Sequence, residues 1–294
     1  SLQEASERKG LNVLHVITKH PASEDKPQPK VPRDSGAMSF SEVFGRTMHE
    51  FLERKEDVYV VSPAMLSAAY LTELKKEFPQ RVIDTGITEQ HAVTFSAGLA
   101  AKGKRVFCHL YSTFSQRAID QIIHDVALQN LPVTFVLDRA GVTGSDGPTH
   151  HGVFDLGLFR VIPNMEIWDA VNGDRLSDIL NYSLNSTGPL AVRIPRSDTH
   201  LSAEEHGELV PIQTISGEGF HGRIVVGHAC ERAQNELFKG PLAILNQVKP
   251  LNQEELYSFL RPLKSVEIWE DNSRMGGIAE QISLMFSQLR IKVV

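Results

Sequence analysis

Residues 81–111 read RVIDTGITEQHAVTFSAGLAAKGKRVFCHLY, and this stretch decides the fold. Two short apolar runs, RVIDTG at 81–86 and RVFCHLY at 105–111, flank the helical pattern EQHAVTFSAGLAAKG at 89–103. Strand-length runs on either side of a helix are typical of a β–α–β unit, in which the two strands pair in parallel. The stretch therefore predicts part of a parallel sheet.

The same alternation extends in both directions. Ser39, with Glu42 three residues later, has the form of a capping box and predicts a helix that begins there. Further strands are expected at 57–63, 133–139, 165–171 and 189–195, with helices at 68–78, 114–130 and 174–186. This order indicates an α/β fold, and we predict a doubly wound, mostly parallel sheet.

A smaller set of elements follows. Strands are expected at 222–229, 241–248, 264–271 and 290–294, with helices at 230–240, 252–262 and 276–289. An apolar run at 11–19 precedes a stretch rich in proline and charge, which is linker composition. We predict four parts: a strand and linker at 1–37, a larger domain at 38–197, a linker at 198–221 and a smaller α/β domain at 222–294.

Composition limits the function classes. The 294 residues carry 30 Lys+Arg and 36 Asp+Glu, a net charge of −6, with 41% hydrophobic residues. This mild acidity argues against nucleic-acid binding, and no apolar run approaches the roughly 20 residues that span a bilayer. The start SLQEASERKG lacks the order of a secretory signal, and two cysteines cannot form a disulfide framework. We expect a cytoplasmic protein that binds neither nucleic acid nor membrane.

Glu89 opens the predicted helix at 89–103. A carboxylate in the first turn is stabilised by the free N–H groups and by the helix dipole. By itself, Glu89 is therefore either a stabiliser of the helix end or a catalytic group.

The segment LDRAGVTGSDGPTHHGVFDL at 137–156 follows a predicted strand. Loops at the carboxyl ends of parallel strands are where open α/β sheets bind ligands. Its glycines permit close backbone approach, Arg139 can bind an anion, and two adjacent histidines titrate near neutrality. A structural turn, with one histidine capping a backbone carbonyl, is the alternative.

Further anion-binding candidates lie nearby. Tyr111 and Phe114 precede the helix expected at 114–130, and Arg117 lies on its first turns, where a cation opposes the helix dipole. Arg193 and Arg196 end another strand and are candidates for an anion site or for the surface. No HxH, HExxH or CxxC spacing occurs, so we assign no metal ligand.

Several of these segments resemble one family. The segments EQHAVTFSAGLAAKG, DQIIHDVALQNLPV, DRAGVTGSDGPTHHGVFD, IPNMEIWDA and VRIPR are similar to the pyrimidine-binding domain of 1-deoxy-D-xylulose 5-phosphate synthases. VKPLN and EDNSRMGG resemble pieces of the transketolase-type C-terminal domain of these enzymes. The resemblance implies thiamine diphosphate and Mg²⁺ as cofactors, and a homodimer. The segment 138–155, with HDVALQNLPV, points to the synthases rather than to other thiamine diphosphate enzymes.

The resemblance also implies residue roles. Glu89 matches the glutamate that hydrogen-bonds a ring nitrogen of the aminopyrimidine and favours its imino tautomer, which deprotonates the thiazolium carbon. Phe114 matches the aromatic residue that stacks on the pyrimidine. The residues that match the acceptor site for glyceraldehyde 3-phosphate are Tyr111, Arg117, Asp146, His150 and Arg196, with Arg139 in the same loop. His150 is the second residue to which we assign a catalytic role.

The sequence departs from the family in the segments that bind the diphosphate. Synthases of this family bind the diphosphate through Mg²⁺ with a GDG motif and a following asparagine, and we find no such segment. The run at 11–19 resembles the last strand of the domain that carries this motif, but His20-Pro21-Ala22 replaces the Gly-Lys-Gly of the family. We therefore expect the metal ligands on a missing domain or companion chain, and no appreciable turnover by this chain alone.

The leading hypothesis is a synthase that joins pyruvate to glyceraldehyde 3-phosphate with loss of CO₂, in non-mevalonate isoprenoid synthesis. A transketolase-like carboligase with another substrate pair is the alternative. A non-catalytic assembly module that kept the fold is a third possibility, against which the joint presence of the charged site residues argues.

Overall fold

The computed structural model describes residues 36–201, 209–230 and 238–294, all within one compact unit at 36–294. The strand expected at 11–19 and most of the helix expected at 230–240 lie outside the described residues.

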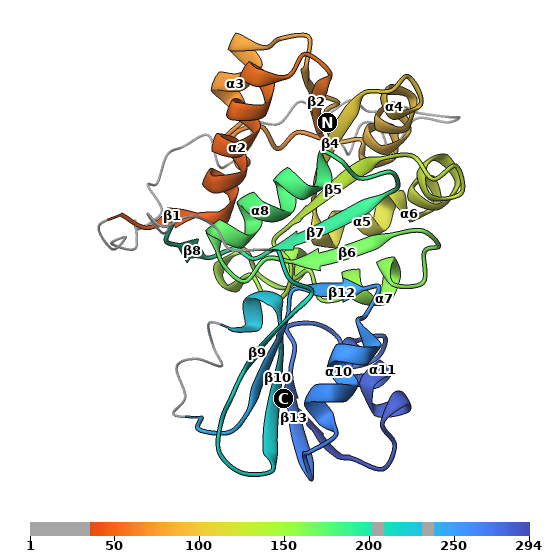
Figure 1. Ribbon diagram of the computed structural model, residues 1–294. Coiled ribbons are helices and arrows are strands. Elements are labelled where there is room, and N and C mark those ends of the chain that lie inside the picture. Colours follow the sequence, from red (N-terminus) through yellow and green to blue (C-terminus); the bar gives the residue numbers. More distant parts are fainter. Residues whose placement is uncertain (1–35, 202–208, 231–237) are drawn as a thin grey trace, which may run out of the picture. The chain divides into compact units, whose positions relative to one another are not determined.

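The larger sheet has the strand order β12-β6-β7-β5-β4-β2-β3 in the described part of the chain (Figure 1). Its strands are β2 (Val58–Ser62), β3 (Val82–Asp84), β4 (Arg105–Tyr111), β5 (Val133–Asp138), β6 (Glu166–Asp169), β7 (Leu190–Ile194) and β12 (Gln247–Lys249). All neighbours pair in parallel except β12 and β6. Since β3 and β4 lie on opposite sides of β2, the strand order reverses there, and such a reversal is where open sheets bind ligands.

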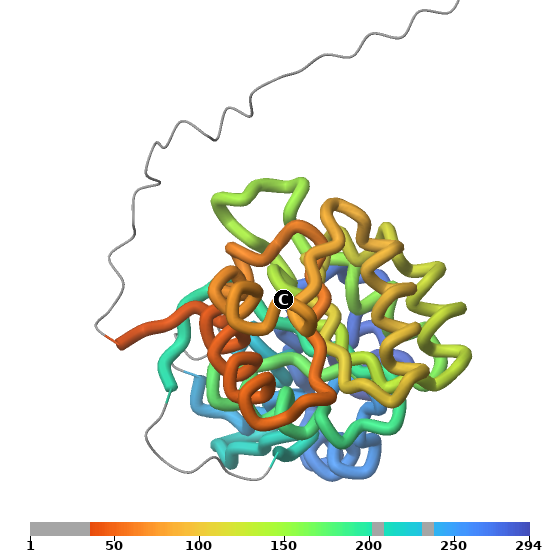
Figure 2. Tube along the Cα trace, turned by 90° about the horizontal axis from the view of Figure 1, so that it is seen from above, coloured from red at the N-terminus to blue at the C-terminus, as the bar shows by residue number. Residues whose placement is uncertain are grey.

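Helices cover both faces of this sheet, so the predicted doubly wound fold is confirmed. α2 (Phe40–Arg54) and α8 (Gly173–Ser183) pack on one face, and α4 (Glu89–Ala101) packs on the other. Figure 2 shows α2 in red-orange and α4 in gold on opposite sides. Strand side chains alternate between the two faces: Val106 and Cys108 enter one apolar core, and Phe107 the other.

The capping box is confirmed at the start of α2, where the Glu42 N–H donates to Ser39 Oγ at 3.1 Å. The shorter helices are α3 (Thr72–Glu77) and α7 (Asp155–Phe159). Within the described ranges, no helix combines the length and the apolar character that crossing a membrane requires.

The single helix expected at 114–130 is wrong, because the structure breaks it into short pieces. These are α5 (Ser112–Ser115), a 3₁₀ turn (Gln116–Ala118), α6 (Ile119–Gln121) and a π-helix (Ile122–Ala127). The break falls at Ala118, whose φ of −117° and ψ of 13° leave the helical region. The wider π turn then buries Ile122, Val126 and Ala127 together.

The smaller sheet has the strand order β14-β13-β10-β11-β9 (Figure 1). Its strands are β9 (Ile212–Ile215), β10 (His221–Val226), β11 (Leu242–Leu245), β13 (Ser265–Trp269) and β14 (Arg290–Val293). Only β9 runs antiparallel to its neighbour. The helices in this part are α10 (Gln253–Leu260) and α11 (Ile278–Met285), with a 3₁₀ turn at Gly227–Ala229.

Two segments differ from the sequence expectation. Residues 198–221, read as a linker, contain β8 (Asp198–Thr199), which pairs with β1 (Met38–Ser39), and also β9. The run 241–248, expected as one strand, forms β11 in the smaller sheet and β12 in the larger one. The chain turns between them at Asn246, whose N–H donates to Pro211 O at 2.9 Å and whose Nδ2 donates to Val210 O at 3.0 Å.

Candidate functional site

The sequence-predicted site residues lie after the carboxyl ends of neighbouring parallel strands. Tyr111 ends β4, Arg139 follows β5 directly, and Arg196 lies two residues beyond β7. Because these strands pair side by side in parallel, their ends meet at the same edge of the sheet. One loop, residues 141–153, carries Asp146 and His150 over this edge and is called the acceptor loop below.

Glu89 is the first residue of α4 and is only 5% exposed. Arg117 Nη1 lies 3.1 Å from Glu89 Oε2, and the Arg117 side chain is 48% exposed. Within the described residues, this buried oxygen accepts no hydrogen bond of good geometry. The Arg117 charge offsets part of the cost of burying this carboxylate, and Oε2 retains the capacity to accept a hydrogen bond from a ligand.

Aromatic rings and a guanidinium form a stack at the end of β4. Tyr111 stacks on Phe114 with ring centroids 5.9 Å apart and an angle of 17°. His150 approaches Phe114 edge-on at 5.3 Å, and the Arg139 guanidinium lies 4.0 Å from the Tyr111 ring centroid. Burial raises the pKa of Tyr111 to about 12, although the nearby Arg139 charge opposes this shift. Tyr111 is therefore a hydrogen-bonding phenol at neutral pH and not a base.

Asp146 joins two of the predicted arginines. Arg139 Nε donates to Asp146 Oδ2 at 2.8 Å, and Arg196 Nη1 lies 3.2 Å from Asp146 Oδ1. Arg139 adopts a left-handed φ of +61°, a conformation that costs a non-glycine residue energy and is frequent at functional sites. Arg139 also pairs with Asp138, so the two guanidiniums face two carboxylates, of which Asp146 is shared.

The structure thus divides the predicted residues into two groups. The larger group comprises Tyr111, Phe114, Arg139, Asp146, His150 and Arg196. Glu89 and Arg117 form a separate pair, and among the described residues no hydrogen bond, ion pair or ring contact joins this pair to the larger group. Arg117 and Arg196 therefore pair with different carboxylates.

The two adjacent histidines have different surroundings. His151 Nδ1 accepts from the Thr143 N–H at 3.2 Å and lies 3.1 Å from Thr143 Oγ1, so this histidine holds the loop together. His150 Nδ1 contacts only the neighbouring Thr149 Oγ1 at 3.0 Å, within the described residues, besides its contacts with the aromatic rings. His151 thus has a structural role, although it accepts from a backbone N–H instead of capping a carbonyl, and His150 is available for a ligand.

Sequence reasoning missed His109, which is fully buried within β4. Its ring nitrogens lie 3.2 Å from Ser62 Oγ and 3.2 Å from Asp138 Oδ2. The same Asp138 oxygen accepts from Ser41 Oγ at 3.0 Å and from Arg139 Nη1 at 3.1 Å. His109 therefore helps to fix the Asp138 carboxylate, which in turn holds the Arg139 guanidinium. A single histidine within the apolar run RVFCHLY was the available signal.

Arg193 is neither a surface residue nor a free anion site, because its side chain is 1% exposed and already paired. Its Nε donates to Asp155 Oδ2 at 2.9 Å, its Nη1 pairs with Asp169, and Ser112 Oγ donates to the same Asp155 oxygen. These carboxylates keep Arg193 charged by raising its pKa, against the opposing effect of burial. Arg193 is therefore a structural centre beneath the site.

His228, in the smaller sheet's part of the chain, extends this buried network. Its Nδ1 lies 2.8 Å from Asp169 Oδ1, and its Nε2 lies 3.4 Å from Asp271 Oδ2. Burial lowers the pKa of His228, but the paired Asp169 and the nearby Asp271 outweigh burial and raise it to about 9. His228 is accordingly an imidazolium at neutral pH.

This raised pKa predicts a loss of stability in mild alkali. A histidine whose pKa is about 9 when folded and 6.5 otherwise stabilises the fold fully below pH 6.5, and this contribution is lost as the pH rises through 9. The contribution amounts to roughly 3 kcal/mol at most. Urea unfolding at pH 6.5 and 9 should show this loss in the wild type and a smaller loss in His228→Gln. Equal losses in the two proteins would contradict the assignment.

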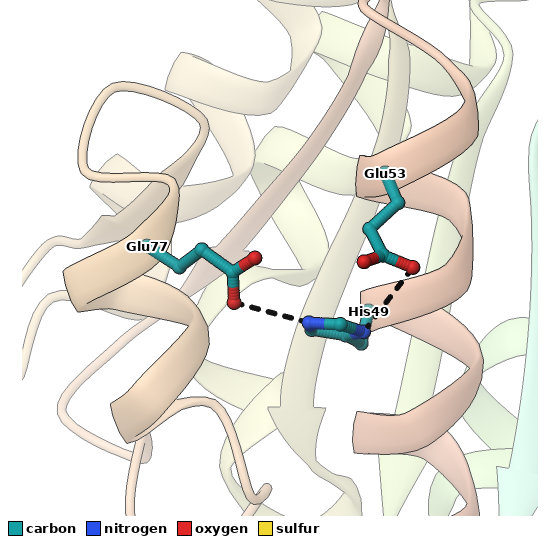
Figure 3. A group of neighbouring side chains, drawn as sticks. All are labelled: His49, Glu53 and Glu77. Carbon is teal, nitrogen blue, oxygen red and sulfur yellow. Dashed lines mark hydrogen bonds and ion pairs between the residues drawn. The ribbon is translucent and has the colours of Figure 1, made fainter.

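A cluster of His49, Glu53 and Glu77 lies apart from this site, on α2 and α3 (Figure 3). Their potential ligand atoms lie within 4.8 Å of one another. However, Glu77 Oε2 faces His49 Nε2 at 3.0 Å, whereas Glu53 Oε2 faces Nδ1 at 3.7 Å. Since the carboxylates approach different ring nitrogens, the arrangement is that of two surface ion pairs, and we assign no metal site to it.

Comparison with known proteins defines the class to which this fold and site belong. The family model of the transketolase pyrimidine-binding domain matches residues 36–200, and the chain belongs to this family. The 1-deoxy-D-xylulose-5-phosphate synthase of Aquifex aeolicus is 37% identical over 98% of this chain and 50% of its own length. That of Carboxydothermus hydrogenoformans is 40% identical over 87% of this chain and 43% of its length. The predicted resemblance is thereby confirmed, and the chain spans about half the length of these relatives.

Solved structures agree on the fold. A structure described as a split gene transketolase, inactive beta4 tetramer, superposes with a TM-score of 0.73 at 22% identity, covering 88% of this chain and 89% of that one. The transketolase of Campylobacter jejuni superposes with a TM-score of 0.70 at 15% identity, covering 88% of this chain and 42% of that one.

Proposed function

We propose that the chain supplies the pyrimidine and acceptor side of a thiamine diphosphate-dependent 1-deoxy-D-xylulose-5-phosphate synthase, which joins pyruvate to glyceraldehyde 3-phosphate with loss of CO₂. The observation that carries the proposal is the buried Glu89 Oε2, which pairs with Arg117 but accepts no well-formed hydrogen bond from any described residue. The other predicted site residues gather at the carboxyl edge of the same sheet. Relatives named 1-deoxy-D-xylulose-5-phosphate synthase are 36–41% identical to this chain.

The residues present fit the aminopyrimidine end of the cofactor. Glu89 Oε2 is a buried acceptor with unused hydrogen-bonding capacity, and Phe114 offers an aromatic face near the same edge. Glu89 would hold a proton at Oε2 against a ring nitrogen, and Phe114 would pack against the ring. When bound, thiamine diphosphate supplies the carbon nucleophile for the carbonyl of pyruvate.

The acceptor loop and the end of β7 fit the phosphorylated aldehyde. Arg139 and Arg196 both contact Asp146, and the Arg196 side chain is 33% exposed, so its guanidinium is accessible to a phosphate. His150 would exchange a proton with the aldehyde or hydroxyl oxygen, beside Tyr111 as a hydrogen-bonding neighbour. Arg117, predicted for the same phosphate, pairs with Glu89, so its phosphate contact stays a prediction.

The proposal extends to Mg²⁺ and to partners. We propose that the ligands of Mg²⁺ and of the diphosphate come from another domain or chain, since the printed sequence holds no GDG motif. One structural neighbour is described as a split gene transketolase, which supports a division of the enzyme over two chains. A homodimer in the cytoplasm is part of the same proposal.

Product formation from pyruvate and glyceraldehyde 3-phosphate tests the function. We expect no appreciable turnover by the 294-residue chain alone with thiamine diphosphate and Mg²⁺, and turnover after addition of a companion domain that carries the GDG motif. Robust synthesis by the chain alone would overturn the proposed division. Product formed only from other donor and acceptor pairs would favour the transketolase-like alternative, and no product from any pair would favour the assembly module.

The same assay distinguishes the acceptor assignment. Replacing Arg196 by alanine should raise KM for glyceraldehyde 3-phosphate about tenfold, leaving KM for pyruvate and for unphosphorylated glyceraldehyde unchanged. Arg46→Ala, which removes an exposed arginine of α2, serves as the control. Equal losses for the two aldehydes would refute a phosphate contact at Arg196.

A further inference from the structure

The acceptor loop is closed at its base by the backbone. The Gly141 N–H donates to Gly152 O at 3.0 Å, and the Gly152 N–H donates back to Gly141 O at 2.8 Å. Asp146 and His150 lie between these two glycines, so the geometry of this base determines where both side chains point.

Residues 271–273, which follow β13 of the smaller sheet, form hydrogen bonds to both sides of this base. The Val142 N–H donates to Asp271 Oδ2 at 3.2 Å, and the Ser273 N–H donates to Val153 O at 2.7 Å. Gly141 has a φ of +75°, and a Cβ there would collide with the Asp271 carboxylate. The loop and Asp271 are therefore in direct contact, with no room for a larger residue.

Asp271 is itself held by the buried charge network. His228 Nε2 lies 3.4 Å from its carboxylate, and Arg193 Nη2 donates to its backbone oxygen at 3.5 Å. Asp169 contacts both partners, through Nδ1 of His228 and Nη1 of Arg193. The carboxylate that holds Val142 thus has little freedom to move.

We propose that Asp271 is a positioning residue, which fixes the base of the acceptor loop and thereby sets the binding geometry of Asp146 and His150 for the phosphorylated aldehyde. The positioning of the loop follows from the contacts above, whereas its effect on substrate rests on the proposed function. Asp271 acts through the backbone of residues 141 and 142.

Hydrogen exchange of the full chain tests the positioning without any substrate. In Asp271→Ala, we expect peptides spanning residues 141–153 to exchange at least tenfold faster, while those of β4 and β5 are unchanged. Asp271→Asn retains an acceptor for the Val142 N–H and should keep the loop near wild-type protection. Ser273→Ala removes no backbone donor and is the matched control, with no change expected.

Wild-type exchange of the loop in Asp271→Ala would overturn the proposal. If Asp271→Ala does not fold, Asp271→Asn still decides, because it keeps the Val142 contact and loses the charge opposite His228. Loop exchange in Asp271→Asn that is ten times faster than in the wild type would then overturn the proposal, and protected loop exchange would support it.

Kinetics of the complete enzyme test the consequence for substrate. We expect Asp271→Ala to raise KM for glyceraldehyde 3-phosphate about tenfold with little change in KM for pyruvate, and Asp271→Asn to restore it. A merely structural role would lower kcat through loss of active enzyme and leave both KM values alone, which would refute the positioning. If the wild-type complete enzyme forms no product, the proposed function fails, but the exchange results still decide whether Asp271 fixes the loop.

Discussion

Glu89→Gln should lower the turnover of the complete enzyme about a hundredfold or more and change the KM values for substrate far less. The side-chain amide cannot hold an acidic proton at the position of Oε2, and general acid–base groups typically contribute a factor of this size. In the described part of the chain Oε2 pairs only with the half-exposed Arg117, so losing the Glu89 charge should cost the fold little and the loss should appear mainly in catalysis. Steady-state kinetics with both substrates measure it.

Glu42→Gln is the matched control for this prediction. Glu42 also lies in the first turn of its helix, α2, where its carboxylate pairs with the exposed Arg46. If Glu89 only stabilised the end of α4, the two variants would behave alike, with a small loss of stability and near-normal turnover. Near-normal turnover in Glu89→Gln would therefore remove its catalytic role.

Arg193→Met should cost about 3–5 kcal/mol in the free energy of unfolding, since it leaves Asp155 buried without its cation and Asp169 with His228 alone. Both carboxylates are fully buried, so water cannot replace the lost charge. Urea unfolding at pH 7 measures the change. Arg193 and Asp169 contact Asp271 and His228, which belong to the part of the chain that forms the smaller sheet. The variant should therefore destabilise the parts that form both sheets.

A surface arginine provides the comparison. Arg54 pairs with Glu50 four residues earlier on α2, with both side chains exposed, and Arg54→Met should cost no more than about 1 kcal/mol. A loss of similar small size in Arg193→Met would mean that Arg193 contributes little to the fold. It would also weaken the argument that the network around it holds Asp271.

The parallel sheet was predictable because its signals are local. Each strand of the larger sheet up to β7 is an apolar run between helical patterns, and both faces are covered, so the runs are continuous rather than alternating. The observed pairing of β4, β5 and β7 brings Tyr111, Arg139 and Arg196 to one edge, because the ends of parallel strands coincide. Grouping by position, however, does not show which carboxylate each arginine meets.

What could not be predicted depends on contacts between residues far apart in sequence. Strand β9 is defined by its pairing with β11. Its residues are mostly exposed, so its sequence shows no apolar pattern. The split of 241–248 depends on β12 finding β6, some 80 positions earlier in the chain. Arg193 meets Asp155, Asp169 and Asp271 through the same kind of distant pairing, and its sequence neighbourhood resembles a surface strand end.

The larger sheet extends beyond the residues that the family model matches, because its edge strand β12 comes from the C-terminal part of the chain. The family match ends at residue 200, yet β6 has its outer neighbour at Gln247–Lys249. Without that neighbour, β6 would be a bare edge, which is a template for pairing with foreign chains. Recombination that replaces the C-terminal half must therefore deliver a strand that fits β6. The two halves can be inherited separately only if they remain matched along this seam.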